Sequence, residues 1–353
     1  MTEIIFDAER MKYPNTGLYY FCLFLGNELV KFDTSNELGL YLPESSFNLF
    51  PEGVSKIKPR AWHKIAMPKL SDIRVWHTTY QLSSYHPPKK NIDIVLTVHD
   101  LNFFKEGKTA GKEKRYLKKL QDNINRASKI VTISNYVKTE IEEFCNLQGK
   151  PVQVIYNGSN FNAEEIAGTA TVNPHDKPFL FTIGTIVAKK NFHVLPYLLV
   201  NNDLDLFIAG ITQDESYKEK IISVAKECGV EDRVKFLGAI SEKEKISYMK
   251  FCEMFVFPSI AEGFGLPVVE AMALGKKTLL SKLTSLPEIG GDLSYYLDNF
   301  EEDYLRQFGG NELIKLLDRE VQSAEIIEWS KQFKWDQAAK SYWEVYKSLL
   351  HGR

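Results

Sequence analysis

Short runs of apolar, β-branched residues alternate with longer amphipathic stretches along this chain. In the first half, three such runs cover Asp93–His99, Ser128–Ser134 and Pro151–Tyr156. The second run ends at residues that can cap a helix, and the third ends at a turn-forming Asn-Gly pair. Short apolar runs followed by helix or turn signals are typical of parallel strands joined by helices.

The same alternation restarts after a polar stretch near the middle of the chain. Four further strands are predicted, each directly before a glycine or a proline: Phe179–Ile183, Asp205–Ala209, Val234–Leu237 and Met254–Phe257. Helical segments such as Tyr217–Gly229 separate them. The predicted fold class is therefore α/β, with two doubly wound, Rossmann-like domains facing a central cleft. Ligands of such sheets bind beyond the carboxyl ends of the strands, where the predicted loops carry Gly17, His99, Gly184, Gly210, Gly238 and Glu262.

The pattern also suggests where the domains begin and end. We expect an N-terminal domain over residues 1–165, a linker over 166–177 and a C-terminal domain over 178–323. The remaining residues, 324–353, carry three tryptophans at helical spacing and are predicted to form a closing helix packed on the core.

Composition narrows the class of protein. The chain has 353 residues, 44% of them hydrophobic and 25% charged, which is enough apolar material for two cores. A net charge of -2 argues against a nucleic-acid partner. No apolar run is long enough to span a membrane, the first residues do not resemble a signal peptide, and the four cysteines lack CxxC spacing. These features favour a cytoplasmic protein with reduced thiols.

The most informative segment for chemistry reads PSIAEGFGLPVVEAMALG and runs from Pro258 to Gly275. A buried strand enters a glycine-containing loop, and Pro267 stands where the first turn of a helix is expected. The amides at this helix N-terminus favour an anion such as a diphosphate. Glu262 and Glu270 flank those amides, and carboxylates accept hydrogen bonds from the vicinal hydroxyls of sugars.

This glutamate motif resembles the signature of the retaining glycosyltransferase family 4, which has the GT-B fold. Within that family, the sequence most resembles bacterial mannosyltransferases of surface-polysaccharide synthesis. The resemblance extends over nearly the whole chain. Its other matches are the His99 loop in TVHDL, the YNG turn at Tyr156, the loop from Gly184 to Asn191, the strand end at Gly238 and a glycine loop at Gly17.

The resemblance implies a role for each matched residue. Glu270 would bind the ribose hydroxyls, Glu262 the donor sugar and Lys190 the leaving diphosphate, while His99 would lie beside the reacting sugar. The expected catalytic residues are thus His99, Glu262 and Lys190. Further donor contacts are expected from Gly17, Gly184, Thr185, Lys189, Gly238, Gly263, Phe264, Gly265 and Leu266. Thr185 stands where many relatives have arginine, so Lys189 would supply the second cation, and Gly17 stands alone where relatives often have two glycines.

The implied reaction transfers a hexose from a nucleotide diphosphate, with GDP-mannose favoured, to a saccharide or lipid-linked glycan with retention of configuration. The N-terminal domain would serve the acceptor and the C-terminal domain the nucleotide sugar. No cofactor and no metal are expected, because lysines and amides can hold the diphosphate. Asp203 and Asp205 form a DxD, which is a metal-binding pattern in other glycosyltransferases. Because this pair lies at the start of a predicted strand, we interpret both residues as polar residues at the strand entry. His63, His77 and His86 lack metal spacing and are expected at the surface or in the acceptor cleft.

Simpler interpretations remain for several of these residues. His99 can be a turn histidine capping residues 100–102, and Lys189 and Lys190 can be solvated lysines. The basic stretch from Lys112 to Lys119 is ordinarily a solvated helix face, or else a peripheral contact with the inner face of a membrane. The sequence does not indicate an oligomeric state.

Three other functional classes also remain. A dinucleotide enzyme is one, because the segment from Gly263 to Val268 resembles a decayed GxGxxG. A nucleotide-sugar epimerase or hydrolase with the same fold would consume the donor without an acceptor. A non-catalytic nucleotide-sugar-binding protein would bind the donor without turnover.

Overall fold

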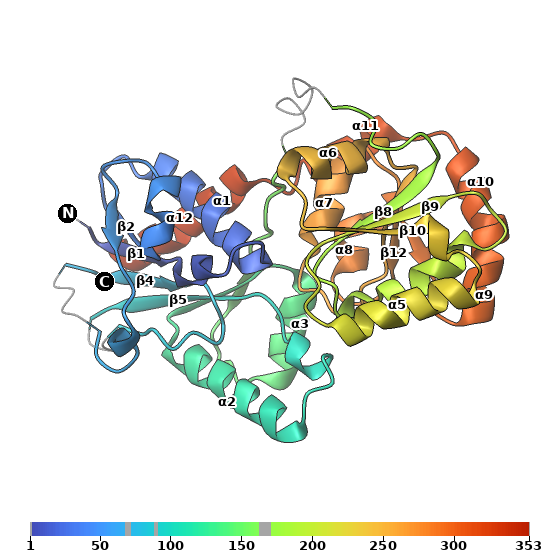
Figure 1. Cartoon of the computed structure of the whole chain (residues 1–353). Coiled ribbons are helices and arrows are strands. Elements are labelled where there is room, and N and C mark those ends of the chain that lie inside the picture. The colour runs from blue at the N-terminus through green and yellow to red at the C-terminus, as the bar shows by residue number, and fades with distance from the viewer. Residues whose placement is uncertain (1, 68–71, 88–90, 162–170, 353) are drawn as a thin grey trace. The chain divides into compact units, whose positions relative to one another are not determined.

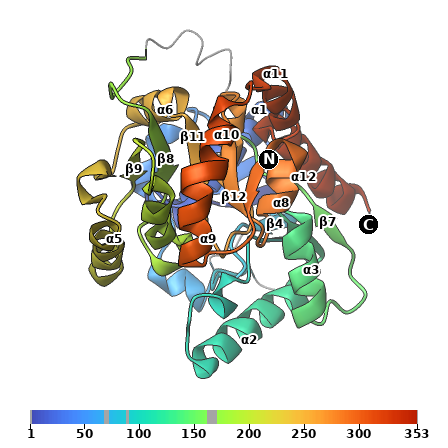
Figure 2. The same cartoon turned by 90° about the vertical axis from the view of Figure 1, so that its right-hand side faces the viewer.

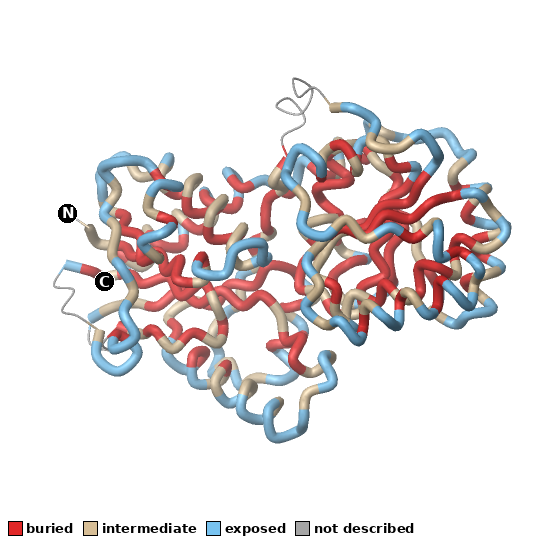
Figure 3. Tube along the Cα trace, viewed as in Figure 1, coloured by how far each residue is buried: buried red, intermediate tan, exposed pale blue. Residues whose placement is uncertain are grey.

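The computed structural model describes residues 2–67, 72–87, 91–161 and 171–352, and it divides into two compact units (Figure 1). Unit 1 consists of Met1–Asn160 and Phe333–Arg353, and unit 2 consists of Phe161–Gln332. Each unit has its own sheet and its own buried residues, which Figure 3 shows concentrated along the strands.

Unit 1 is built on a seven-stranded sheet of order β3-β2-β1-β4-β5-β6-β7, in which all neighbouring strands are parallel. The strands are short and mostly apolar because helices cover both faces of a parallel sheet. The three strands predicted for the first half of the chain are confirmed. The strands are β1 (Ile4–Asp7), β2 (Leu38–Tyr41), β3 (Ser55–Ile57), β4 (Val75–Thr78), β5 (Asp93–Val98), β6 (Lys129–Thr132) and β7 (Val152–Val154).

Two pairs of helices cover this sheet (Figure 1). The pair α1 (Gly17–Phe32) and α12 (Trp335–His351) pack against each other, and α12 contacts β4 and β5. On the other side, α2 (Ala110–Arg126) buries Leu120 and Ile124 against apolar residues of β5, and α3 (Asn135–Phe144) lies beside β6 and β7. Short 3₁₀ helices follow several strands: η1 (Glu9–Lys12), η2 (Glu44–Leu49), η3 (Ala61–Lys64) and η4 (Asn102–Phe104).

Buried hydrogen bonds make the last helix an integral part of unit 1. The two ring nitrogens of His77 lie 2.6 Å from the Tyr346 hydroxyl and 2.7 Å from Thr97 Oγ1, which in turn lies 2.9 Å from the Tyr342 hydroxyl. The expectation that His77 lies at the surface or in a cleft is therefore wrong: the side chain is fully buried between β4 and α12. The helical stretch expected as one closing segment is also divided, because α11 (Ser323–Ser330) packs on α7 (Leu266–Ala273) in unit 2.

Unit 2 has a six-stranded parallel sheet of order β10-β9-β8-β11-β12-β13. All four strands predicted for the second half are confirmed. The strands are β8 (Phe179–Ile183), β9 (Asp205–Ala209), β10 (Val234–Gly238), β11 (Met254–Phe257), β12 (Thr278–Ser281) and β13 (Tyr295–Leu297).

Helices surround these strands in both views (Figures 1 and 2). Besides α7 and α11, they are α5 (Glu215–Glu227), α6 (Glu242–Phe251), α8 (Leu286–Gly290), α9 (Glu302–Gln307), the π-helical turn η9 (Phe308–Glu312) and α10 (Leu313–Asp318). The 3₁₀ helices are η5 (Ala188–Lys190), η6 (Phe192–Leu199), η7 (Glu231–Arg233) and η8 (Gly291–Leu293).

The two sheets share one topology. Counted from the first strand of each unit, the strand order is 3-2-1-4-5-6 in unit 2 and the same in unit 1, where a seventh strand extends the sheet beyond strand 6. The order reverses between β1 and β4 in unit 1 and between β8 and β11 in unit 2. Open α/β sheets bind ligands at the carboxyl edge where the strand order reverses, because the connecting helices there lie on opposite faces and leave a crevice. The fold thus provides one candidate binding position in each unit.

Candidate donor site and the residues expected to act with it

The loops that follow β8 and β11 meet at the reversal point of unit 2. Gly184 ends β8 and leads into η5, which carries Lys189 and Lys190. After β11, the backbone amide of Ile260 and the hydroxyl of Ser259 both donate to the Lys189 carbonyl, at 2.9 and 3.0 Å. These bonds fix the loop that carries Lys189 and Lys190 against the glutamate loop.

Two of the expected catalytic residues form an ion pair at this point. Lys190 Nζ lies 2.5 Å from Glu262 Oε1, and each side chain is 14% exposed. The Ser259 hydroxyl lies 2.7 Å from the same oxygen, and the ring of Phe257 lies 4.9 Å from the ammonium group. A pair that is mostly shielded from water interacts more strongly than a surface pair. An incoming diphosphate can compete for this ammonium group and release the carboxylate for sugar hydroxyls.

The glutamate loop leads directly into α7, as predicted. Gly265 has φ +102°, a left-handed conformation that favours glycine, and it is the N-cap of the helix, with Pro267 in the first turn. The Ser285 hydroxyl lies 3.1 Å from each of the carbonyl oxygens of Glu262 and Phe264, and Thr284 Oγ1 accepts from the Glu262 amide at 3.2 Å. These contacts hold the loop that carries Gly263, Phe264, Gly265 and Leu266 at the positive end of the helix dipole.

The second glutamate of the motif is buried on α7. Glu270 is 2% exposed, and its Oε1 lies 3.1 Å from the ammonium group of Lys245 on α6. Lys245 also lies 2.8 Å from Glu242 and 4.6 Å from the ring of Phe161. Burial would lower the pKa of Lys245, but the charges of Glu270 and Glu242 outweigh it and raise that pKa above its ordinary value. Lys245 is therefore held as a cation beside Glu270.

The strand-end glycines bring neighbouring loops into close contact. Gly210 has φ +131°, and a β-carbon there would lie 2.0 Å from the Gly184 carbonyl oxygen, so only glycine fits. The Gly210 amide donates to the Gly238 carbonyl at 2.7 Å, and the Gly184 amide donates to Ala209 at 3.0 Å. Gly184, Thr185 and Gly238 thus belong to a row of loops along one edge of the unit 2 sheet.

His99 and Gly17 belong to unit 1. His99 directly follows β5 and is 7% exposed; its Nε2–H donates to the Thr79 carbonyl at 2.8 Å, and its ring packs edge-on against Phe21. Burial lowers the pKa of His99 to about 4; the Thr79 hydrogen bond opposes this shift, and the charge of Arg10 adds to it. The imidazole is therefore neutral at physiological pH, with Nδ1 as its acceptor atom.

The alternative role of His99 as a cap for residues 100–102 is not what the structure shows. The amide of Asn102 is capped by the Asp100 carboxylate at 3.0 Å. Gly17 is the first residue of α1, it is exposed, and a β-carbon there would meet no atom within 4 Å. Packing within unit 1 does not require a glycine at this position.

Three side chains that hold the site were not singled out from the sequence. Lys245 lies in a helix rich in alternating charges, where it looks like a solvated lysine. Ser259 and Ser285 look like ordinary loop serines. The signal that could have identified Lys245 is its position: apolar neighbours in α6 bury one face of the helix, and Lys245 lies on that face with Met249.

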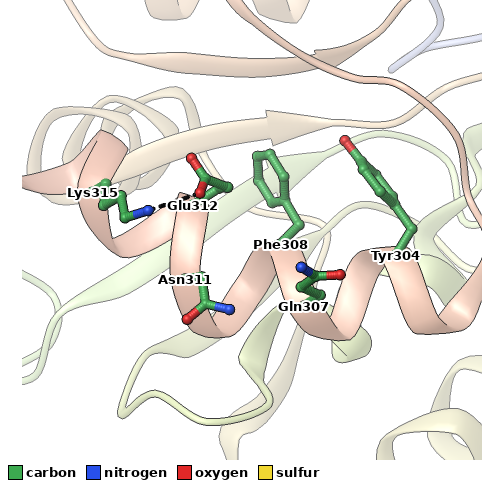
Figure 4. A pocket seen from close by; sticks show the side chains of 6 residues that line it. All are labelled: Tyr304, Gln307, Phe308, Asn311, Glu312 and Lys315. Carbon is green, nitrogen blue, oxygen red and sulfur yellow. Dashed lines mark hydrogen bonds and ion pairs between the residues drawn. The ribbon is translucent and has the colours of Figure 1, made fainter.

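One hollow of unit 2 lies apart from these loops. Its volume is about 430 Å³, and it lies along α9, η9 and α10 (Figure 4). The side chains that line it are Tyr304, Gln307, Phe308, Asn311, Glu312 and Lys315. None of the expected site residues is among them, and Lys315 pairs with Glu312 at 2.9 Å.

Metal ligands and membrane spans were also sought in the described part of the chain. No group of three or more His, Cys, Asp or Glu side chains there could hold a metal ion. None of the helices described is both long and apolar enough to cross a membrane.

Comparison with known proteins agrees with this architecture. The family model "Glycosyltransferase Family 4" matches residues 40–162, and "Glycosyl transferases group 1" matches residues 165–301. O-antigen chain mannosyltransferase B of Escherichia coli is 24% identical, over 98% of this chain and 100% of that protein. Among solved structures, sucrose-phosphate synthase of Thermosynechococcus elongatus gives a TM-score of 0.76 at 16% identity with both chains fully covered. Anabaena HepE in complex with UDP-glucose gives 0.75 at 15% identity, over 99% and 100% of the two chains.

The two parallel-sheet Rossmann-like units and the structural neighbours show the GT-B fold, and the matching family models show that the class of protein is a glycosyltransferase. Within that class, the chain belongs to glycosyltransferase family 4, also described as glycosyl transferases group 1.

Proposed function

We propose that this glycosyltransferase moves mannose from GDP-mannose to a glycan acceptor and retains the anomeric configuration. The observation that carries the proposal is the pair of Lys190 and Glu262 at the reversal point of unit 2, beside the N-terminus of α7. A cation and a helix N-terminus suit a diphosphate, and a carboxylate next to them suits the hydroxyls of the attached sugar.

Each residue then has a defined task in the reaction. Lys190, with the amides of the Gly263–Leu266 loop and with Lys189, holds the donor diphosphate and stabilises the charge that grows as the glycosidic bond breaks. Glu262, once released from Lys190, orients the donor sugar. Glu270 accepts hydrogen bonds from the ribose, and the neutral imidazole of His99 positions a sugar hydroxyl.

Retention without a protein nucleophile fits these assignments. Both motif glutamates bind hydroxyls in this proposal, so neither is left to form a covalent glycosyl intermediate. The acceptor then attacks on the face that the diphosphate leaves, and a donor phosphate oxygen accepts the acceptor proton. Lysines and amides hold the diphosphate, so we propose that no metal takes part.

Mannose is proposed because the relative that matches over both full lengths is named a mannosyltransferase. HepE, whose structure holds UDP-glucose, is only 15% identical, and its likeness concerns the fold. The guanine preference rests on the similarity of the motifs around Gly17, His99 and Gly184 to mannosyltransferases.

The test is to incubate the purified chain with GDP-α-mannose and a mannose-terminated oligosaccharide and to follow the product by NMR. A new α-mannoside, formed equally well in EDTA, is expected. A β-mannoside would overturn retention, and activity lost in EDTA and restored by magnesium or manganese would overturn metal independence. Tighter calorimetric binding of UDP than of GDP would overturn the donor base. Free or epimerised sugar without a new glycoside would indicate a hydrolase or an epimerase instead.

A further inference from the structure

Unit 1 has its own reversal point, and the residues around it are cationic and aromatic. β1 leads into η1, which carries Arg10, and β4 leads to Tyr80. These two strands are neighbours where the strand order reverses, so their following loops border the crevice that such sheets use for ligands. This is the same topological position that the pair of Lys190 and Glu262 occupies in unit 2.

Arg10 is held in place without an anionic partner in the described part of the chain. Its guanidinium carbon lies 4.6 Å from the ring centre of Tyr13 and 4.3 Å from that of Tyr80, so the group is fixed between two aromatic rings. Its Nε is buried, and no hydrogen-bond acceptor for that nitrogen exists among the residues that the structure describes. A buried donor without an acceptor costs free energy, and a planar guanidinium matches the oxygens of phosphate or carboxylate.

Other cations gather near Arg10 and also lack carboxylate partners. Burial lowers the pKa of Lys119 on α2, and the charges of Lys64, Arg10 and Arg115 lower it further, which places each of these three cations within electrostatic reach of Lys119. Lys119 Nζ donates to Ser84 Oγ at 2.5 Å. Across the described ranges of the chain, none of the four forms a salt bridge.

Neighbouring lysines do have carboxylate partners, so the excess of positive charge is confined to the cluster around Arg10. Lys12 pairs with Glu9, and Lys108 pairs with Glu106 at 2.9 Å. The nearby carboxyl of Asp7 does not compensate either, because burial raises its pKa to about 8 and leaves it largely neutral at pH 7. The chain as a whole has a net charge of -2, so an unpaired basic cluster at a ligand-binding edge is a specific feature of this position.

We infer that this edge of unit 1 binds the acceptor through an anionic group, and that the acceptor is a glycan carrying a phosphate. Arg10 and Lys119 contact the phosphate, Lys64 and Arg115 add long-range attraction, and the hydroxyls of Tyr13 and Tyr80 face the sugar next to it. The charge of Arg10 reaches His99, so this edge also includes the histidine expected beside the reacting sugar. The inference rests on the proposed function only in calling this ligand the acceptor.

Calorimetry without any donor tests the binding itself. The probes are mannobiose with a phosphate at its reducing end, the neutral methyl glycoside of mannobiose, and inorganic phosphate. The phosphorylated probe is expected to bind at least 10-fold more tightly than either of the others and to weaken as salt is added. Equal affinity for the two mannobiose probes would overturn the inference, and so would inorganic phosphate binding as tightly as the phosphorylated glycan.

Substitutions locate the binding position. Arg10→Gln and Lys119→Gln are each expected to remove most of the preference for phosphate and to leave the neutral probe unchanged. Lys31→Gln is the matched control, because Lys31 is a 69% exposed lysine on α1 that pairs with Glu28. A preference that survives both cluster variants, or that Lys31→Gln removes equally, would overturn the assignment. Using two separate cluster variants guards against one of them failing to fold.

Transfer assays separate this inference from the proposed function. With GDP-mannose as donor, Arg10→Gln is expected to raise KM for the phosphorylated acceptor at least 10-fold, whereas the control Lys31→Gln leaves both KM and kcat unchanged. If no transfer occurs at all but the phosphate preference and its loss in the variants remain, the proposed function fails and the anion site stands. If transfer occurs without any phosphate preference, the anion site fails and the proposed function stands.

Discussion

The two units place opposite kinds of charge arrangement at the same topological position. In unit 2, two cations near the edge have carboxylate partners: Lys190 pairs with Glu262, and Lys245 pairs with Glu270. In unit 1, Arg10 is fixed by aromatic rings and has no carboxylate partner among the residues that the structure describes. An edge with paired charges can accept a ligand that carries both a diphosphate and hydroxyls, because the cation binds the diphosphate and the carboxylate binds the hydroxyls. An unpaired cationic edge favours an anion alone.

The largest expected effect comes from removing the cation of the unit 2 pair. Lys190→Ala should lower kcat by about 10²–10³, because the charge on the leaving diphosphate grows towards the transition state. Donor affinity should change less than kcat. Lys282→Ala is the control, since Lys282 is an exposed lysine of the same unit. Steady-state kinetics with varied donor measure both constants; a change in the donor KM alone would contradict the leaving-group role.

His99→Ala should reduce transfer by about 10², the effect of losing a positioning group, while GDP binding by calorimetry stays normal. The pKa of His99 is lowered to about 4, so this residue should not cause any change in the wild-type rate near pH 6.5. His86→Ala is the control: burial also lowers the pKa of His86 to about 4, but His86 does not follow a strand. A folded His99→Ala enzyme with nearly full activity would remove His99 from the site.

The buried pair of unit 2 should act on nucleotide affinity. Glu270→Ala removes a carboxylate that accepts ribose hydrogen bonds of roughly 1.5–3 kcal/mol each, so GDP binding should weaken about 10- to 100-fold. Lys245→Met should weaken it by a smaller factor, because Lys245 only positions Glu270. Calorimetry of both single variants and the double variant measures the coupling between them. Unchanged GDP affinity in Glu270→Ala would exclude Glu270 from the ribose site.

Substitution of Asp7 is expected to have the smallest effect on transfer. Its effect is measured instead as a change in the pH dependence of the free energy of unfolding. The folded pKa of about 8 lies above the usual 3.8, so the folded chain keeps a proton that the unfolded chain releases. The stability from this group is complete below pH 3.8 and is lost as the pH rises through 8, with a slope of at most about 1.4 kcal/mol per pH unit. Asp7→Asn should therefore gain stability over wild type between pH 5 and 8.

Urea unfolding at several pH values measures this difference. Asp298→Asn, at a carboxylate that is 63% exposed, is the control and should follow the wild-type pH dependence. Parallel curves for Asp7→Asn and wild type would show that Asp7 is charged in the folded chain and would weaken the contrast between the two edges.

Much of this architecture could be predicted because parallel strands leave a strong local pattern. Residues 254–257 are apolar throughout and form β11 as expected, and the proline after the glutamate loop starts α7 as expected. No strands were predicted for residues 1–80, where β1 to β4 have only three or four residues each. Local pattern is weak for strands of three or four residues.

The charge pairs could not be predicted for a different reason. Lys245 and Glu270 are 25 positions apart, and only the packing of α6 against α7 brings them together. The same holds for Arg10 and Tyr80, which meet because β1 and β4 are neighbours. Sequence spacing identifies the residues that face an edge, and three-dimensional packing determines which of them become partners.

The division of the chain between the two units has a consequence for synthesis on the ribosome. Unit 2 is one continuous segment, whereas unit 1 needs α12, which is made after unit 2. Until Tyr342 and Tyr346 emerge, the polar side chains of His77 and Thr97 lack the hydrogen bonds that these two hydroxyls provide, and part of one face of the first sheet is uncovered. The unit that begins first is therefore completed last, and the nascent chain must hold an unfinished sheet while the second unit folds.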